Sequence, residues 1–338
     1  MTLPFLPLGK LPAHLLQQVL ARAPIQDPRV MLGPGIGIDC AVIDTGPSLL
    51  VFKAEPITFV TSEIGWYAVQ ISINDIATTG AQPRWFMTTL LLPERRTTQK
   101  MVFEINDQVY NACKKLGISV IGGHTEITHG LDRPLLVGTM IGEVAHERLV
   151  TPRGASPGDR VLLTKGIPIE ATAILAREFP DRLRGVIGNP ALEQAANYLY
   201  DPGISVLKEA QIAVDTGGVS AMHDPTEGGL AAALWELATA SQHTLRIDPG
   251  KVPVPELSRK ICQFFNLDPF ATIASGALLL TVRPEFADKV RQALEEEEIT
   301  CAEIGRVEDG PVAVWNGFGP DAKKINQPDR DEITRVFE

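Results

Sequence analysis

The segment Ser72-Ile-Asn-Asp-Ile-Ala-Thr-Thr-Gly80 places an acidic side chain, Asp75, inside an otherwise apolar run. The pattern predicts a helix from about residue 64 to residue 79 that stops at the glycine. On that helix Asp75 shares a face with apolar residues, so we expect its carboxylate to point at the core or into a cleft. A carboxylate removed from water is costly unless a cation or hydrogen bonds compensate it. The alternative to a cation is a nearby helix N-terminus that donates hydrogen bonds to Asp75.

Three further acids in the same half of the chain lie at the ends of apolar runs. Asp39 opens Asp-Cys-Ala-Val-Ile, Glu55 closes Leu-Leu-Val-Phe-Lys-Ala-Glu, and Glu126 follows Val-Ile-Gly-Gly-His-Thr. Taken alone, Asp39 fits a turn residue that caps its own backbone, and Glu55 fits a solvated strand end. Four such acids indicate one shared compensator, and we expect a divalent metal ion carrying a phosphate ligand. Asn74 adds a second oxygen of the type that hard cations bind.

The segment Gly122-Gly-His-Thr-Glu126 follows an expected strand at 118–121. The glycines Gly122 and Gly123 allow the backbone to approach a ligand closely. His124 and Glu126 are two residues apart, so in an extended chain they face the same side. The alternative is a glycine bulge beside a hydrogen-bonded core histidine.

The segment His223-Asp-Pro-Thr-Glu-Gly-Gly229 joins an expected strand to a helix at 230–240. Thr226 is the expected N-cap, and the backbone N–H groups at that helix end would hold an anion. Gly228 and Gly229 favour contact with a phosphate, although a simple strand-to-helix turn explains them equally well. Lys53 is a candidate for contact with the γ-phosphate, with a solvated strand lysine as the alternative.

The composition indicates a globular protein of two domains. The chain has 338 residues, of which 44% are hydrophobic and 21% charged, with a formal net charge of −10. This acidity and the absence of a basic run argue against nucleic-acid binding. The four cysteines have no Cys-x-x-Cys spacing, which argues against a thiolate metal site or a disulfide framework. We find no signal-peptide pattern and no bilayer-spanning run, so we expect a reduced, cytoplasmic protein without membrane contact.

Strands and helices alternate in both halves of the chain, which predicts an α/β fold. The prolines and glycines of residues 151–159 predict a linker, so we divide the chain into domains at 1–150 and 151–338. The expected strands are 41–44, 49–53, 84–92, 118–121, 135–144, 160–164, 219–222, 277–282 and 302–307. The expected helices are 11–21, 64–79, 102–116, 169–178, 204–213, 230–240 and 285–297.

Common nucleotide and hydrolase motifs are missing from the sequence. There is no Gly-x-x-x-x-Gly-Lys-Ser/Thr loop, no Gly-x-Ser-x-Gly elbow and no His-Glu-x-x-His pair. The run Gly33-x-Gly-x-Gly37 lacks the full spacing of a dinucleotide-binding loop.

Taken together, these segments resemble the aminoimidazole ribonucleotide (AIR) synthetase superfamily, which includes selenophosphate synthetase, thiamine-monophosphate kinase and the hydrogenase-maturation protein HypE. The resemblance is nearest to HypE-like and AIR synthase-related proteins. The matching pieces are Gly37-Ile-Asp-Cys-Ala-Val42, Lys53-Ala-Glu-Pro56, Ser72 to Pro83, Gly122 to Glu126, Gly158-Asp159 with Leu163-Thr-Lys-Gly166, and Asp224 to Gly229.

The resemblance implies a two-domain PurM-like α/β fold in which the N-terminal sheets of two subunits pair into a barrel. Domain 1–150 would bind ATP and Mg²⁺ and form the homodimer, and domain 151–338 would be the AIR synthase-type domain. Asp39, Glu55 and Asp75 become metal ligands, and Asp75 and His124 become catalytic groups. The implied cofactor-binding residues are Lys53, Asn74, Gly122, Gly123, Glu126, Asp224, Gly228 and Gly229.

The sequence departs from the family pattern at several positions. Ile38 and Cys40 flank Asp39, which reduces the usual acidic pair, and Glu55 stands where an aspartate is usual. HypE carries a C-terminal cysteine that receives a carbamoyl group, whereas the last cysteine here is Cys301. The cysteine used by selenophosphate synthetase is also not matched, and His124 replaces the aspartate that is usual in thiamine-monophosphate kinase.

These observations predict an ATP- and Mg²⁺-dependent enzyme that activates or phosphorylates a small-molecule oxygen nucleophile. Much of the catalysis would be positioning and neutralisation of charge. Two alternatives remain: a nucleotide-binding scaffold without catalysis, and an accessory protein that works with a partner of the hydrogenase-maturation type. The second substrate is not identified by the sequence.

Overall fold

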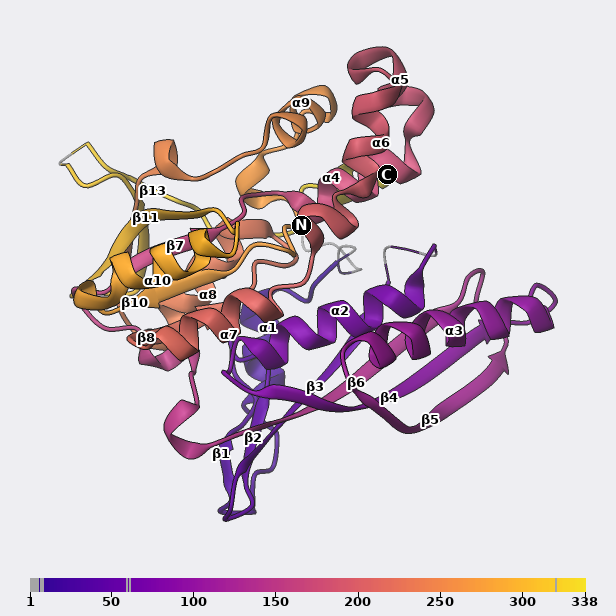
Figure 1. Ribbon diagram of the computed structural model, residues 1–338, viewed down its shortest axis with the longest axis horizontal. Coiled ribbons are helices and arrows are strands. Elements are labelled where there is room, and N and C mark those ends of the chain that lie inside the picture. The colour runs from indigo at the N-terminus through magenta and orange to yellow at the C-terminus, as the bar shows by residue number, and fades with distance from the viewer. Residues whose placement is uncertain (1–5, 7–8, 59, 61, 320) are drawn as a thin grey trace. The chain divides into compact units, whose positions relative to one another are not determined.

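The computed structural model describes residues 6, 9–58, 60, 62–319 and 321–338, and the chain divides into two compact units (Figure 1). The smaller unit contains residues 25–33 and 39–149. The larger unit contains residues 34–38 and 150–338 together with the described residues up to 24. Residues 34–38 and those up to 24 precede the expected linker, yet they cluster with the second half of the chain.

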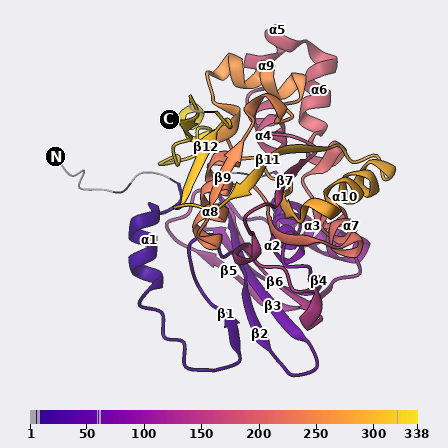
Figure 2. The same cartoon turned by 90° about the vertical axis from the view of Figure 1, so that its left-hand side faces the viewer.

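The smaller unit is built on a six-stranded sheet in the order β1-β2-β3-β6-β4-β5. Its strands are β1 (Val30–Leu32), β2 (Ala41–Asp44), β3 (Leu49–Ile57), β4 (Gln82–Pro93), β5 (Ser119–Thr128) and β6 (Leu135–Val144). Neighbouring strands are antiparallel except β4 and β5, which run parallel. Strands β1 to β3 lie at one end of the sheet (Figure 2) and β5 forms the opposite edge.

Helices α2 (Ile64–Ala77) and α3 (Gln99–Lys115) lie side by side along this sheet (Figure 1). Every residue of α2 except Trp66 is buried, because α3 covers one side of the helix and β3, β4 and β6 cover the other. The helices approach closely at Gly65, where an added Cβ would lie 2.4 Å from the carbonyl oxygen of Ile105. A helix buried on all sides is usually apolar all round, and α2 departs from this rule at its buried polar side chains Gln70, Ser72, Asn74 and Asp75.

The larger unit contains a seven-stranded sheet in the order β13-β12-β9-β11-β7-β10-β8. Its strands are β7 (Arg160–Thr164), β8 (Val219–His223), β9 (Thr244–Ile247), β10 (Leu279–Val282), β11 (Cys301–Glu308), β12 (Ala313–Asn316) and β13 (Lys323–Lys324). Its helices are α1 (Ala13–Leu20), α4 (Ile169–Glu178), α5 (Pro180–Ile187), α6 (Asn189–Asn197), α7 (Leu207–Thr216), α8 (Gly229–Ser241), α9 (Glu256–Phe265), α10 (Pro284–Glu296) and α11 (Thr334–Phe337). Only β9 and β12 are parallel among the described pairs.

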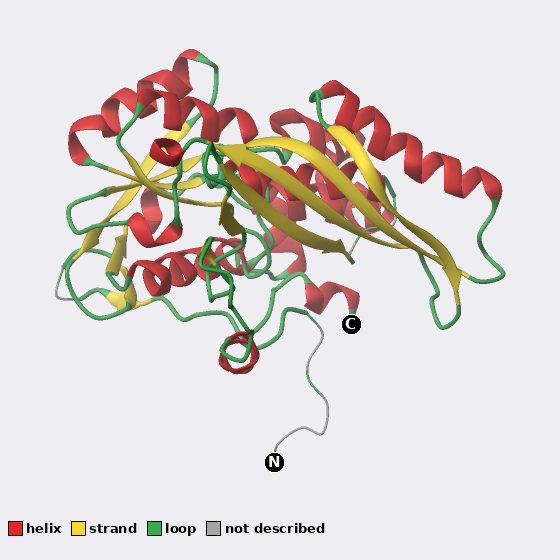
Figure 3. Cartoon of the chain, turned by 90° about the horizontal axis from the view of Figure 1, so that it is seen from below, coloured by secondary structure: helices red, strands yellow, loops and turns green. Residues whose placement is uncertain are grey.

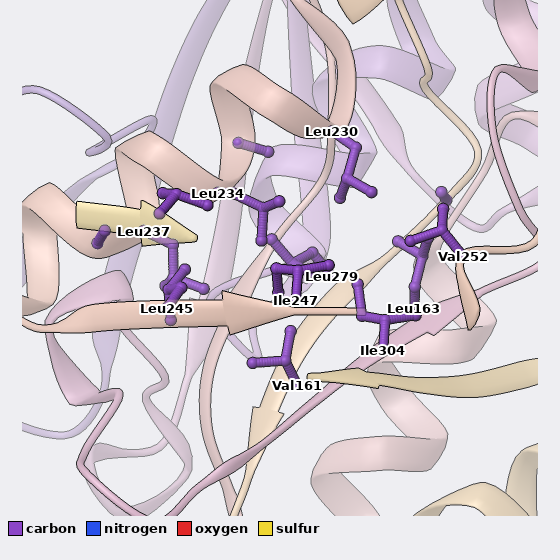
Figure 4. Packing of buried hydrophobic residues seen from close by; sticks show 14 of the residues in the cluster. Val161, Leu163, Leu230, Leu234, Leu237, Leu245, Ile247, Val252, Leu279 and Ile304 are labelled. Carbon is purple, nitrogen blue, oxygen red and sulfur yellow. The ribbon is translucent and has the colours of Figure 1, made fainter. Parts of the chain in front are cut away.

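The core of the larger unit lies between this sheet and α8 (Figure 4). Leu230, Leu234 and Leu237 follow one another at helical spacing along α8 and are fully buried. They pack against sheet residues that include Leu245 and Leu279. Burying each such leucine contributes roughly 2 kcal/mol, so this face holds α8 firmly in place.

Most of the expected elements are present, and several expectations were wrong in detail. The strand expected at 49–53 continues to Ile57, so Glu55 lies within β3 rather than at a strand end. The strand expected at 118–121 continues to Thr128, so Gly122 to Glu126 lie within β5 rather than after it. Thr226 is not the N-cap of α8; the cap is Gly228, whose backbone is left-handed at φ 81°. The helix expected at 204–213 begins at Leu207 and extends to Thr216.

Several elements were not predicted, among them β9, β12 and the helices α5, α6 and α9. The long strands of the smaller unit are seen from below in Figure 3. No helix among the described residues is both long and apolar enough to cross a membrane.

Candidate functional site

Three of the predicted ligands meet around one lysine in the smaller unit. Lys53 and Glu55 lie on β3, Asp39 precedes β2, and Asp75 lies on α2. The Nζ atom of Lys53 lies near one carboxylate oxygen of each acid: 3.0 Å from Glu55, 3.3 Å from Asp75 and 3.9 Å from Asp39. Residues distant in sequence therefore form one acidic cluster, which we call the acidic triad (Asp39, Glu55 and Asp75).

The strand period explains why Lys53 and Glu55 point the same way. Side chains two residues apart on a strand share a face, and the buried Val51 and Ile57 belong to the same row. This row faces α2, which packs on β3. Lys53 and Glu55 are therefore held on the side of the sheet where α2 presents Asp75.

Solvent exposure differs within the acidic triad. Asp75 is buried and forms what we call the base of the triad, whereas Asp39 and Glu55 are partly exposed. The side chain of Asp75 is 4% exposed, whereas those of Asp39 and Glu55 are 26% and 31% exposed. Burial disfavours the charge on Lys53, but the carboxylates of Asp75, Asp39 and Glu55 outweigh it and hold the pKa of Lys53 well above its ordinary value. Lys53 is therefore a permanent cation within the triad.

The backbone beneath Asp75 is fixed by two side chains. Cys40 donates its S–H to the carbonyl oxygen of Asp75 at 3.3 Å, and Thr78 donates its hydroxyl to the same oxygen at 2.7 Å. Cys40, which departs from the acidic pair of the family, thus ties the start of β2 to α2. Asn74, the neighbour of Asp75, is fully buried in α2.

Gly122, Gly123, His124 and Glu126 lie on the edge strand β5. The Nε2 atom of His124 lies 3.3 Å from Glu126 Oε2, and their side chains are 66% and 52% exposed. The two side chains therefore share a face as expected, but His124 is not a core residue. An added Cβ at Gly123 would lie 2.1 Å from the carbonyl oxygen of Thr88, so close pairing with β4 accounts for this glycine.

A bulge in β5 directly precedes these glycines. The register with β4 shifts between Phe86 and Met87, where Val120 and Gly122 are the successive partners and Ile121 is the extra residue. The extra residue is Ile121 rather than a glycine, and His124 is exposed, so the alternative of a glycine bulge beside a core histidine was wrong. The charged residues of β3 and β5 have different partners: Lys53 forms ion pairs with the acidic triad, whereas His124 forms an ion pair with Glu126.

Asp224, Gly228 and Gly229 belong to the larger unit. Asp224 is 1% exposed. The N–H of Gly228 donates to Asp331 Oδ2 at 2.6 Å, so a carboxylate of this chain already accepts a bond at the start of α8. An added Cβ at Gly229 would lie 2.6 Å from the carbonyl oxygen of Phe270, so close packing requires this glycine.

The neighbouring His223 is held between two acids. Its Nε2 atom lies 2.9 Å from Glu236 Oε2, and its Nδ1 atom lies 3.1 Å from the carbonyl oxygen of Asp224. Lys10 Nζ binds the other oxygen of Glu236 at 3.0 Å. Asp224 was recognisable from its motif, whereas the contacts that run from His223 through Glu236 to Lys10 were not predicted.

Two buried acids of the larger unit were missed altogether. Burial raises the pKa of Glu170 to about 7 despite hydrogen bonding at Ser275, and the negative charge of Asp331 adds to the rise. Burial likewise raises the pKa of Asp331 to about 6 against the N–H groups of Ile333 and Gly228. Glu170 lies in an apolar run, Ile-Pro-Ile-Glu-Ala-Thr-Ala-Ile-Leu, so the signal that identified Asp75 was present here too.

The larger unit also contains a buried lysine in a different setting. Lys165 Nζ lies 2.6 Å from Glu209 Oε1 and donates to the carbonyl oxygens of Gly203 and Ser205 at 3.1 and 2.7 Å. The side chains of Lys165 and Glu209 are 7% and 5% exposed. Burial lowers the pKa of Lys165, which the single carboxylate of Glu209 offsets only in part.

Comparison with known proteins places both halves of the chain in one group. A model described as AIR synthase related protein, N-terminal domain, matches residues 37–144, and the corresponding C-terminal domain model matches residues 156–316. A carbamoyl dehydratase HypE of Rhizobium leguminosarum bv. viciae is 28% identical over 261 residues, covering 76% of this chain and 71% of that protein. A thiamine-monophosphate kinase of Pyrococcus horikoshii is 28% identical over 271 residues, covering 78% of this chain and 77% of that protein.

The fold is also found among solved structures. A crystal structure of the hydrogenase maturation protein HypE in complex with ATP superposes with a TM-score of 0.72 at 22% identity, covering 95% of this chain and 91% of that one. This likeness confirms the predicted α/β fold class of the PurM-like type.

Proposed function

The chain belongs to the AIR synthase-related protein family, as its motifs predicted, and we propose that it is an ATP-dependent enzyme that activates or phosphorylates a small-molecule oxygen nucleophile. The observation that carries the proposal is the convergence of Asp39, Glu55 and Asp75 on one point in the smaller unit. Carboxylate oxygens are the protein ligands that Mg²⁺ prefers, so this donor set fits the metal. When bound, the metal would neutralise the charge of the nucleotide phosphates.

The residues of this chain would divide the remaining work. Asp39, Glu55 and Asp75 would hold the metal, and Lys53 would exchange its carboxylate contacts for the γ-phosphate. His124 and Glu126 form an exposed acid–base pair that suits contact with the second substrate. Within the smaller unit, Asn74, Gly122 and Gly123 are proposed to contact the nucleotide. Asp224, Gly228 and Gly229 of the larger unit keep their predicted role as nucleotide-binding residues.

The relatives point to two fates for the phosphate. In a kinase such as thiamine-monophosphate kinase the phosphate stays on the product, whereas a dehydration driven by ATP releases it. An assay of ADP and inorganic phosphate with Mg²⁺, with and without candidate acceptors, separates these reactions. ADP formation that disappears in EDTA supports the proposal, and no ADP formation with any acceptor contradicts it.

A catalytically inactive scaffold is the second candidate, because Lys53 already neutralises part of the triad. Calorimetry with ATP and Mg²⁺ distinguishes the two. Binding without ADP release would favour the scaffold, and binding followed by turnover would favour the enzyme.

We also propose that the working protein is a homodimer formed through β5. This strand is the edge of its sheet, and its apolar side chains Val120, Ile121 and Ile127 are 37%, 53% and 60% exposed. An exposed apolar edge strand is prone to pair with another strand unless it is covered. Light scattering of the wild type and of Ile127→Lys tests this: a wild-type monomer would contradict the proposal, and a dimer weakened by the lysine would support it.

A further inference from the structure

The acidic triad converges on a cation that the chain itself supplies. The three carboxylate oxygens lie within 3.0 to 3.9 Å of Lys53 Nζ, and the lysine side chain is only 13% exposed. The ammonium group thus occupies the point toward which Asp39, Glu55 and Asp75 are directed. A metal ion bound by these acids would need the same place.

We propose that Lys53 is a resident cation that closes the triad to free divalent ions, so that metal enters only together with the nucleotide. The first half of this inference concerns the triad alone, and the second half rests on the proposed function. In this proposal the side chain of Lys53 determines that the metal ion binds together with the nucleotide and not before it.

In this proposal the two cations compete for the triad, because the ammonium group already lies near one oxygen of each carboxylate. Mg²⁺ binds oxygen at about 2.1 Å and requires near-octahedral ligands, which places it among the oxygens that now surround the ammonium. Like charges a few ångströms apart repel strongly where water is largely excluded. Lys53 must therefore leave before Asp75, at the buried base, accepts a metal ion.

The geometry allows the side chain of Lys53 to move while its backbone stays fixed. Lys53 pairs with Met140 of β6, and the preceding Phe52 pairs with Ala41 of β2, so β3 is held on both sides. The four-carbon stem of lysine is flexible, and its ammonium makes contacts without a fixed orientation. A triphosphate would offer Lys53 new anionic partners at the moment when the metal takes over the carboxylates.

The binding of Mn²⁺ without nucleotide tests the inference. Binding is monitored as the loss of the electron paramagnetic resonance signal of free Mn²⁺. Lys53→Met should bind Mn²⁺ at least about tenfold more tightly than wild type, because a unit positive charge is removed from the site. Lys53→Arg, which keeps the charge, should behave as wild type. Lys100→Met is the matched control, since it removes an exposed lysine of α3 in the same unit.

A second pair of variants keeps the test decisive if Lys53→Met fails to fold. Lys53→Met/Glu55→Gln has the same net charge as the wild type, and it is compared with Glu55→Gln alone. Tighter Mn²⁺ binding by the double variant supports the inference. Equal Mn²⁺ affinity in both members of this pair, or wild-type protein that binds Mn²⁺ as tightly as Lys53→Met, overturns it.

Failure of the proposed function would give a different result. In that case the wild type would take up no Mn²⁺ even with a non-hydrolysable ATP analogue, while Lys53→Met would still gain affinity for Mn²⁺ alone. If instead the wild type binds Mn²⁺ and the analogue but Lys53→Met shows no gain, the function stands and the role of Lys53 is refuted.

Discussion

Two buried lysines, one in each unit, have opposite electrostatic settings. Lys165 in the larger unit meets one carboxylate, Glu209, and two backbone carbonyl oxygens. Lys53 in the smaller unit meets three carboxylates. Accordingly, burial lowers the pKa of Lys165, whereas the carboxylates of Asp75, Asp39 and Glu55 outweigh burial and raise the pKa of Lys53.

The difference distinguishes an ion pair that stabilises the fold from a cluster of acids that can bind a further cation. The three donors of Lys165 are used by three acceptors, and its charge is balanced by one acid. At Lys53 the acids outnumber the lysine, so the cluster retains an excess of negative charge that a second cation would relieve. Excess charge of this kind is more informative about function than burial alone, because both lysines are largely buried.

The largest expected effect tests the structural member of the comparison. Glu209→Ala leaves the ammonium of Lys165 buried without its carboxylate and should lower the free energy of unfolding by about 3–5 kcal/mol. Replacing both partners, as in Lys165→Met/Glu209→Leu, should restore most of that loss. Urea unfolding measures both, with Glu193→Ala on the exposed side of α6 as the control. A loss no larger than in the control would mean that the pair is not structural.

Glu170 extends the comparison to an acid without a lysine, since within the described chain its Oε2 atom has no hydrogen-bond partner. Its pKa is raised from 4.5 to about 7, so the folded state retains a proton that the unfolded chain loses. Stability from this group is therefore full below about pH 4.5 and is lost as pH rises to about 7, by roughly 3 kcal/mol in total. Urea unfolding of wild type and Glu170→Gln across this range should show the difference between them changing with pH; a constant difference would refute the assignment.

Asp75→Asn tests the functional member. It retains the shape of the side chain but removes a charged ligand from the buried base of the triad, so ATP turnover should fall by about a hundredfold or more. ADP formation at saturating ATP and Mg²⁺ measures the effect. Glu104→Gln on α3 removes an exposed carboxylate of the same unit and should retain full turnover. Undiminished turnover in Asp75→Asn would place the metal elsewhere.

The smallest effect is expected at an ion pair that neither site uses. Arg160 and Glu303 lie 3.3 Å apart with side chains 42% and 30% exposed. Glu303→Gln should change the free energy of unfolding by about 0.5 kcal/mol or less, because water screens exposed pairs. Urea unfolding in low and high salt checks this value, and a loss comparable to that of Glu209→Ala would erase the distinction between the two classes of pair.

The sequence carried enough information to assemble the triad but not to place Lys53 within it. Asp39, Glu55 and Asp75 were recognisable because each interrupts or ends an apolar run, and the family motifs linked them. Lys53 was expected to meet a phosphate or solvent, because no local pattern shows which charges face a strand lysine across the fold.

The same limit explains the residues that were missed. Glu170 has the same local signal as Asp75 but no associated motif, so it was passed over. Asp331 accepts from Gly228 only because the chain returns to the start of α8 after more than a hundred residues, a contact that no short pattern contains. Thr226 satisfied the usual preference for an N-cap, yet the left-handed Gly228 takes that position, because α8 begins at Gly229 and Thr226 lies outside the helix.

The close approach at Gly65 fixes the distance between helices α2 and α3. Gly65 and Asp75 are ten residues apart, about 15 Å along the helix axis, and α2 is rigid because it is buried on nearly every side. A single methyl group at Gly65 would tilt or shift the whole helix and carry the distant carboxylate with it. The position of the Asp75 carboxylate therefore depends on the absence of a side chain at Gly65, about three helical turns away.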